Sequence, residues 1–352
     1  RDDHGVVEAV ENHWKFQPKV KQFRIFEVPE AATRLAMLTT GEADIIDAPP
    51  KDVNGLLAQG FLWASSGQAT QLGVFFSGNL WEETHALTGQ PVSREGAYVH
   101  DLPYIGNPKD AADMEEARKV RLAMAMAIDK EAINDAILDG RGWPVHLEYL
   151  SIRNPNWQNK WEIPYDPERA KALLKETAWP NGFSTPLYIG PEFGGGASFA
   201  GEIGDAIAGY WNAIGIRTEV LKYAYATFRP SVVGRTNTIP WLTSCDEGQE
   251  HRPWDWPRGL PMTTMTRGGF SCGFESPWIA QHFLQQAREP DVNRRIQMTN
   301  EWADYMYQWV LAPGVVAVPA GAVYNPKSIS SYEGRIGGFL SVGGLWDFVP
   351  AK

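Results

Sequence analysis

Short apolar, strand-like runs alternate with segments that carry helix start and stop signals along most of this 352-residue chain. Residues 20–28 alternate apolar and polar side chains, as a half-buried strand does. Asp166-Pro167-Glu168 combines an N-cap residue, a proline at the first helical position and an acidic first turn. Because strands that alternate with helices through short loops pack in layers, the sequence predicts an α/β fold.

Hydrophobic periodicity and turn residues place the other elements. We expect strands at residues 20–28, 44–46, 72–76, 187–189, 216–221 and 315–318, and helices at 33–40, 115–128, 129–140, 167–176, 199–214, 277–288 and 291–310. Residues 231–276 differ, because they are rich in Pro, Gly, Trp and Thr and show no sustained periodicity. A loop of this length inside a compact domain is usually functional or disordered, and its aromatic residues favour a function.

The charge balance limits the partners of the chain. There are 32 Lys and Arg residues against 42 Asp and Glu, a net charge of −10, which argues against a nucleic-acid partner. No apolar run reaches the ~18 residues that a membrane-spanning helix needs. The first residue is Arg1 rather than Met, so we expect a longer gene product whose secretion signal would lie outside this chain.

Motifs for catalysis and metal binding are weak. Residues 269–273 (GFSCG) match the G-x-S-x-G nucleophile elbow, but the flanking strand and helix are missing. The only histidine after Ser271 is His282, which leaves no room for the usual acid between them. The histidines are scattered without metal-ligand spacing. We therefore expect no catalytic residue, metal or cofactor, and a serine hydrolase that uses Ser271 is the alternative.

Two further features leave alternatives open. Cys245 and Cys272 are either reduced core thiols or one disulfide, and their spacing does not decide between them. A glycine-rich stretch lies between an expected strand and an expected helix, and it lacks the P-loop lysine. Gly195, Gly196 and Ser198 are candidates to present backbone N–H groups to an anion at the helix start, and a plain connecting loop is the alternative.

Several segments resemble one known family, the family 5 extracellular solute-binding proteins of ABC importers, of the dipeptide, oligopeptide and nickel type. Three matches are distinctive: residues 29–45 (PEAATRLAMLTTGEADI), 119–133 (KVRLAMAMAIDKEAI) and 165–174 (YDPERAKALL). Asn12-His13-Trp14 followed by Pro18-Lys19, and residues 203–220, resemble the family less specifically. All five occur in the family's order over some 200 residues.

The resemblance implies a two-lobe, periplasmic-binding-protein-like fold of type II, with ligand between lobes joined by two crossing strands. The chain resembles the C-terminal two-thirds of such a protein: residues 1–78 end lobe I, 79–318 form lobe II, and 319–352 return to lobe I. It implies a monomeric, periplasmic or extracellular protein, with or without a lipid anchor, and an ABC permease as partner. A sensory or receptor module on the same fold is an alternative.

The resemblance also implies ligand contacts in lobe II. Peptide-binding relatives carry an acidic loop residue there, and the corresponding passage here begins at Trp241. We expect Trp241 to line the site, Asp246 or Glu247 to face a cationic or hydroxyl group, and Trp254 or Trp256 to stack on the ligand. The family's DYPDP motif is absent from this passage, so a sugar-like or cationic solute fits as well as a peptide.

Two expectations complete this picture. The extracytoplasmic placement favours a Cys245–Cys272 disulfide. Aromatic side chains that simply bury a long loop are the alternative to a ligand site.

Overall fold

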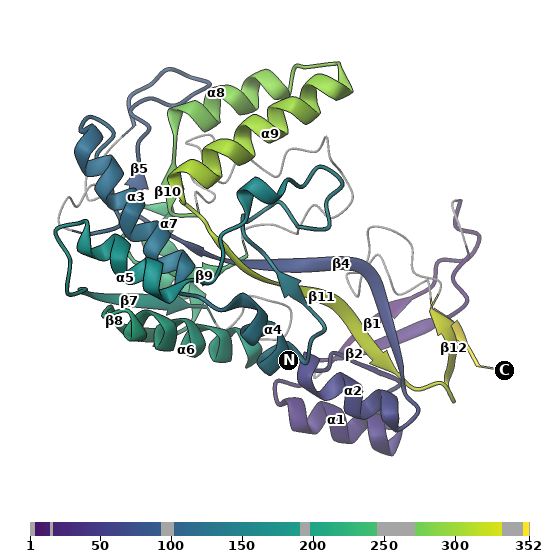
Figure 1. Cartoon of the computed structure of the whole chain (residues 1–352). Coiled ribbons are helices and arrows are strands. Elements are labelled where there is room, and N and C mark those ends of the chain that lie inside the picture. The colour runs from purple at the N-terminus through teal and green to yellow at the C-terminus, as the bar shows by residue number, and fades with distance from the viewer. Residues whose placement is uncertain are drawn as a thin grey trace. The chain divides into compact units, whose positions relative to one another are not determined.

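The computed structural model describes residues 4–14, 17–92, 102–190, 198–244, 272–332 and 348–351. The chain divides into two compact units. Unit 1 comprises residues 1–69, 137–141 and 319–352, and unit 2 comprises residues 70–136 and 142–318. Three elements run from one unit into the other: β4 (Leu62–Phe75), α4 (Lys130–Leu138) and β11 (Gly314–Tyr324) (Figure 1).

Unit 1 is built around a small apolar cluster. Leu38, Val53 and Leu56 pack together with Ile46. The first helix ends where Gly41 adopts a φ of +80° and donates its N–H to the carbonyl of Leu38, a left-handed C-cap that favours glycine. The elements of this unit are β1 (His4–Glu8), β2 (Gln22–Phe26), α1 (Ala31–Thr40), β3 (Ile45–Ile46), α2 (Pro50–Ala58), β12 (Ile329–Tyr332) and β13 (Phe348–Pro350).

Unit 2 is built on a mixed sheet with the strand order β11-β4-β9-β7-β8. β9 (Trp241–Thr243) lies antiparallel to β4 and parallel to β7 (Ser184–Ile189), which in turn lies parallel to β8 (Arg217–Lys222). α6 (Ser198–Ala213) connects β7 to β8 and packs along both strands, which makes a βαβ unit (Figure 1). β6 (Trp143–Pro144) pairs with the start of β11.

Capping residues and large aromatic side chains stabilise the rest of unit 2. Asp110, Asp166 and Asp291 each cap a helix by accepting backbone N–H bonds in its first turn. Among the described residues of this unit, four tryptophans are fully buried: Trp161, Trp211, Trp241 and Trp302. The remaining elements are β5 (Asn79–Leu80), α3 (Ala111–Met126), η1 (Asn159–Trp161), α5 (Pro167–Lys175), α7 (Tyr225–Val233), β10 (Phe274–Glu275), α8 (Pro277–Gln286) and α9 (Val292–Trp309).

The α/β class expected from the sequence is confirmed, and α5 begins at Pro167 directly after its Asp166 cap. Two helices, α2 and α7, were not expected. Proline opens α2 at Pro50, where no N–H is needed, and Pro230 lies inside α7. β4 and β11 also extend well beyond the apolar runs that predicted them.

Candidate functional site

The carboxyl ends of β7 and β9 lie at one edge of the sheet in unit 2, here named the β7/β9 edge. The parallel register pairs Tyr188 with Trp241 and Ile189 with Leu242. Residues 190–197 and 244–271, which follow these strands, therefore start from the same edge. Because α/β sheets bind ligands beyond the carboxyl ends of their parallel strands, this edge is the candidate site.

Most of the residues that the sequence predicted as ligand contacts lie outside the described residues. These are Gly195, Gly196, Cys245, Asp246, Glu247, Trp254 and Trp256. Ser198 is the first residue of α6, and its side chain is also outside the described part. Their ligand roles stay predictions. The structure shows the described residues that come directly before and after the two segments that contain them.

Trp241 is the predicted site residue that the structure describes most fully. Its side chain is completely buried, and its ring packs 6.2 Å from that of Phe75 and 5.3 Å from that of Phe228. Its indole N–H donates a 3.0 Å hydrogen bond to the carbonyl of Cys272. This hydrogen bond therefore links a residue shortly before the 245–271 segment to the residue directly after it. The ring of Trp241 packs in the core.

The end of that segment is anchored by polar groups. Cys272 takes part in a disulfide, and its pairing with Cys245 stays a prediction because Cys245 lies outside the described residues. Gly273 has a φ of +99°, and a Cβ there would lie 2.3 Å from the Oγ of Ser77. Arg235 donates to both carboxylate oxygens of Glu275, from Nε over 2.9 Å, and both side chains are buried. The segment thus ends in a rigid part of the core.

Gln71 lies at the same edge and was missed from the sequence. The antiparallel register opposes Gly73 to Thr243, the last residue of β9, so Gln71 lies just beyond the end of β9. Its side chain is fully buried, and neither amide atom has a hydrogen-bond partner in the described part of the chain. An unsatisfied buried polar group costs about 1–3 kcal/mol, which a ligand or water would recover.

Glu148 shares this face of β4. A Cβ on Gly73 would lie 2.8 Å from Oε2 of Glu148, so the fully buried carboxylate lies directly over the glycine. Gln71 and Gly73 are two residues apart on one strand, and their side-chain positions point to the same face. The carboxamide of Gln71 and the carboxylate of Glu148 therefore lie on the same face of β4 near the β7/β9 edge. The sequence signal for Gln71 was a polar residue next to the apolar run at 72–76.

A second polar group in unit 2 surrounds His146. Its Nδ1 lies 3.1 Å from the backbone nitrogen of Ile163, whose carbonyl accepts a 3.0 Å hydrogen bond from Lys130. Burial and the neighbouring Lys130 lower the pKa of His146 to about 4. Burial lowers the pKa of Lys130 to about 8. His146 is therefore neutral near pH 7, and its Nδ1 lies 3.1 Å from both the backbone nitrogen and the carbonyl oxygen of Ile163.

Comparison with known proteins identifies the family. The model of the bacterial extracellular solute-binding proteins, family 5, middle region, matches residues 1–239. The chain belongs to this family. Heme-binding protein A of Haemophilus influenzae is 28% identical over 228 residues, which are 63% of this chain and 35% of that protein. The dipeptide-binding protein of Escherichia coli is 25% identical over 348 residues, 94% of this chain and 56% of that protein.

A solved structure shows the same fold for this family 5 chain. The ABC transporter-associated periplasmic binding protein DppA from Helicobacter pylori, in complex with the peptide STSA, superposes with a TM-score of 0.70 at 14% identity. The alignment covers 100% of this chain and 61% of that one. The type II periplasmic-binding-protein fold expected from the resemblance is thus confirmed, and the chain spans between about a third and two-thirds of the length of these relatives.

The family consists of binding proteins, and the relatives named above are binding proteins too. The family 5 chain is therefore not assigned as an enzyme, and Ser271, the alternative nucleophile, lies outside the described residues. Among the described residues, no three His, Cys, Asp or Glu side chains gather as a metal site would require. No described helix is long and apolar enough to cross a membrane.

Proposed function

We propose that this chain belongs to the solute-binding component of an ABC importer, which captures a small solute and delivers it to a membrane permease. The family match over residues 1–239 is the observation that carries the proposal. In this assignment unit 1 contributes to lobe I and unit 2 forms lobe II. The protein works in the periplasm or outside the cell, as a monomer, with or without a lipid anchor.

The ligand site is proposed at the β7/β9 edge. Asp246 or Glu247 faces a cationic or hydroxyl group, and Trp254 or Trp256 stacks on the ligand. Gly195, Gly196 and Ser198 offer backbone N–H groups to a carboxylate at the start of α6.

Gln71 extends this proposed site. The amide of Gln71 offers a donor and an acceptor, which match a peptide group. Together with the proposed acidic contact from Asp246 or Glu247, this amide favours a peptide-like solute with a free amino group over a sugar-like or simple cationic one. Two relatives carry the names dipeptide-binding and glutathione-binding protein, which supports this choice, whereas another is named a heme-binding protein.

Native mass spectrometry of protein purified without denaturation tests the function, because a bound solute is carried into the measurement. Calorimetric titration with a dipeptide, glutathione and haem then compares candidate ligands. We expect Asp246→Ala and Gln71→Leu each to weaken binding of the best of these at least about tenfold, the loss of one charge-assisted or buried hydrogen bond. Glu219→Ala, an exposed carboxylate on β8, is the matched control and should change nothing.

Three results would count against the proposal. Normal binding by both Asp246→Ala and Gln71→Leu would place the ligand site elsewhere. Covalent labelling of Ser271 by a fluorophosphonate probe would favour the hydrolase alternative. A bound solute without stimulation of any reconstituted permease would favour the sensory module.

A further inference from the structure

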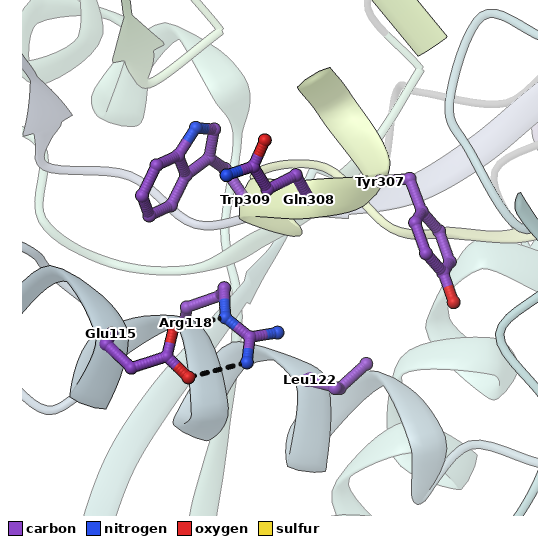
Figure 2. Close-up of a pocket in the computed structure, with 6 residues that line it drawn as sticks. All are labelled: Glu115, Arg118, Leu122, Tyr307, Gln308 and Trp309. Carbon is purple, nitrogen blue, oxygen red and sulfur yellow. Dashed lines mark hydrogen bonds and ion pairs between the residues drawn. The ribbon is translucent and has the colours of Figure 1, made fainter. Parts of the chain in front are cut away.

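A pocket of about 320 Å³ lies between α3 and α9, entirely within unit 2 (Figure 2). Pockets that hold small molecules have volumes of ~300–1,000 Å³, so this one fits a compact ligand. Its walls come from one face of α3 and from the last turn of α9. The lining residues are Glu115, Arg118, Leu122, Tyr307, Gln308 and Trp309.

Arg118 is the charged donor that faces this pocket. Its Nε and Nη2 each donate a 2.6 Å hydrogen bond to Glu115, and its side chain is 26% exposed. The remaining nitrogen, Nη1, makes no hydrogen bond to any described residue, and Figure 2 shows the guanidinium opposite the α9 residues. Glu115, and after it the nearby Tyr307, raise the pKa of Arg118. Arg118 therefore keeps a charged donor for a ligand.

Arg121, one turn further along α3, adds positive charge behind the pocket. Its side chain is fully buried and forms no ion pair with any described residue. Nε and Nη1 each donate 2.8 Å hydrogen bonds, to the carbonyls of Trp309 and Tyr104, while Nη2 has no partner in the described part of the chain. Burial and the neighbouring Arg118 lower its pKa to about 9.

The charges around the pocket therefore favour an anion. Arg118 lines the pocket beside Glu115, the one carboxylate among the lining residues. Arg121 donates its hydrogen bonds to neutral oxygen atoms, and the carboxylates that act on it electrostatically are Glu115 and Asp113, of which Asp113 lies outside the lining. The carbonyl of Trp309, which would attract a cation at the end of α9, already accepts from Arg121. The walls next to Arg118 are apolar or aromatic: Leu122, Tyr307 and Trp309.

We propose that this pocket binds a small amphipathic carboxylate. A carboxylate oxygen accepts from Arg118 and the hydroxyl of Tyr307, while the apolar body of the ligand packs against Leu122 and Trp309. The proposal uses neither Gln71 nor the segments at the β7/β9 edge, so it is independent of the solute site.

Fluorine NMR titration of the full chain with fluorophenylacetate tests this site. We expect saturable binding, and at least about tenfold weaker binding of the neutral analogue fluorophenylacetamide, because the charge-assisted hydrogen bond is lost. Arg118→Gln should weaken fluorophenylacetate about tenfold. Glu115→Gln should strengthen it several-fold, because Glu115 competes with the ligand for Arg118.

The matched control is Arg294→Gln, which breaks a similar exposed ion pair on α9, Arg294 with Glu301 at 2.7 Å, and should leave binding unchanged. Circular dichroism establishes whether each variant is folded. If Arg118→Gln is unfolded, Glu115→Gln still tests the proposal, because it is expected to strengthen binding rather than weaken it. Equal binding of the acid and the amide, weaker binding by Glu115→Gln, or no saturable binding would overturn the proposal.

Discussion

At the scale of single residues, Arg235 and Glu275 form a bidentate ion pair inside unit 2, with 6% and 1% of their side chains exposed. Removing one partner leaves the other charge buried, which costs about 3–5 kcal/mol, whereas an apolar pair of similar size is often neutral. We expect Glu275→Leu to lose stability in that range, and Arg235→Met combined with Glu275→Leu to recover most of it. Urea unfolding of the two single variants and the double variant measures this. A double variant as unstable as the worse single one would contradict the argument.

His146 gives a prediction for pH. Its pKa is about 4 in the folded chain and 6.5 as the ordinary value, so the unfolded chain takes up the proton first as the pH falls. Stability is therefore fully present above pH 6.5 and falls towards pH 4, by up to roughly 3 kcal/mol. In His146→Gln this loss should be absent, whatever its stability at neutral pH. The measurement is the unfolding free energy of the wild-type chain and of His146→Gln between pH 4 and pH 7. If both lose stability in parallel as the pH falls, the loss does not come from His146.

At the scale of elements, two glycines of α6 make a matched pair. A Cβ on Gly204 would lie 1.7 Å from Cδ1 of Ile189 on β7, whereas a Cβ on Gly209 meets nothing within 4 Å. Gly204→Ala forces the helix and strand apart and should cost about 1–3 kcal/mol. Gly209→Ala should stabilise by about 0.5–1 kcal/mol, because alanine favours a helix. Thermal unfolding of both variants tests this, and a stabilised Gly204→Ala would show that the contact is loose.

The 245–271 segment carries a prediction of its own. A Cys245–Cys272 disulfide would close a loop of this size and stabilise the chain by about 3 kcal/mol in the chain-entropy model. We expect no free thiol in oxidised, denatured protein and two after reduction, measured with a thiol reagent. Two thiols before reduction would exclude the pairing.

Local signals explain which elements the sequence predicted. Asp166-Pro167 fixes the start of α5 because cap and proline act within one turn. The sequence did not predict α7, because Pro230 indicates a helix break. Burial of Phe228 and Val232 stabilises the helix in spite of this proline. The register of β4 places Gln71 beyond the end of β9, and packing places Glu148 over Gly73; no local sequence pattern contains either arrangement. The family resemblance predicted the fold, and the site residues outside the described part stay predictions.

At the scale of the whole molecule, the two units have separate apolar clusters. Leu38 belongs to the cluster of unit 1, while Ile207 of α6 is fully buried in unit 2. Truncating either to alanine should cost about 2–5 kcal/mol. We expect Leu38→Ala to reduce hydrogen-exchange protection in α1 and α2 but not in β7 and β8, and Ile207→Ala to do the reverse. Equal loss everywhere would show that the chain unfolds as one cooperative unit.

The hydrogen bond from Trp241 to Cys272 has a consequence for how such a protein diversifies. The stretch between them starts and ends at neighbouring positions that the core already holds. Lengthening a loop whose ends are fixed costs little, because the closure entropy grows only with the logarithm of its length. A stretch held in this way can change in length or sequence while the surrounding scaffold is kept. Under the proposed ligand contacts, such changes would alter the ligand preference of the protein without requiring a new fold.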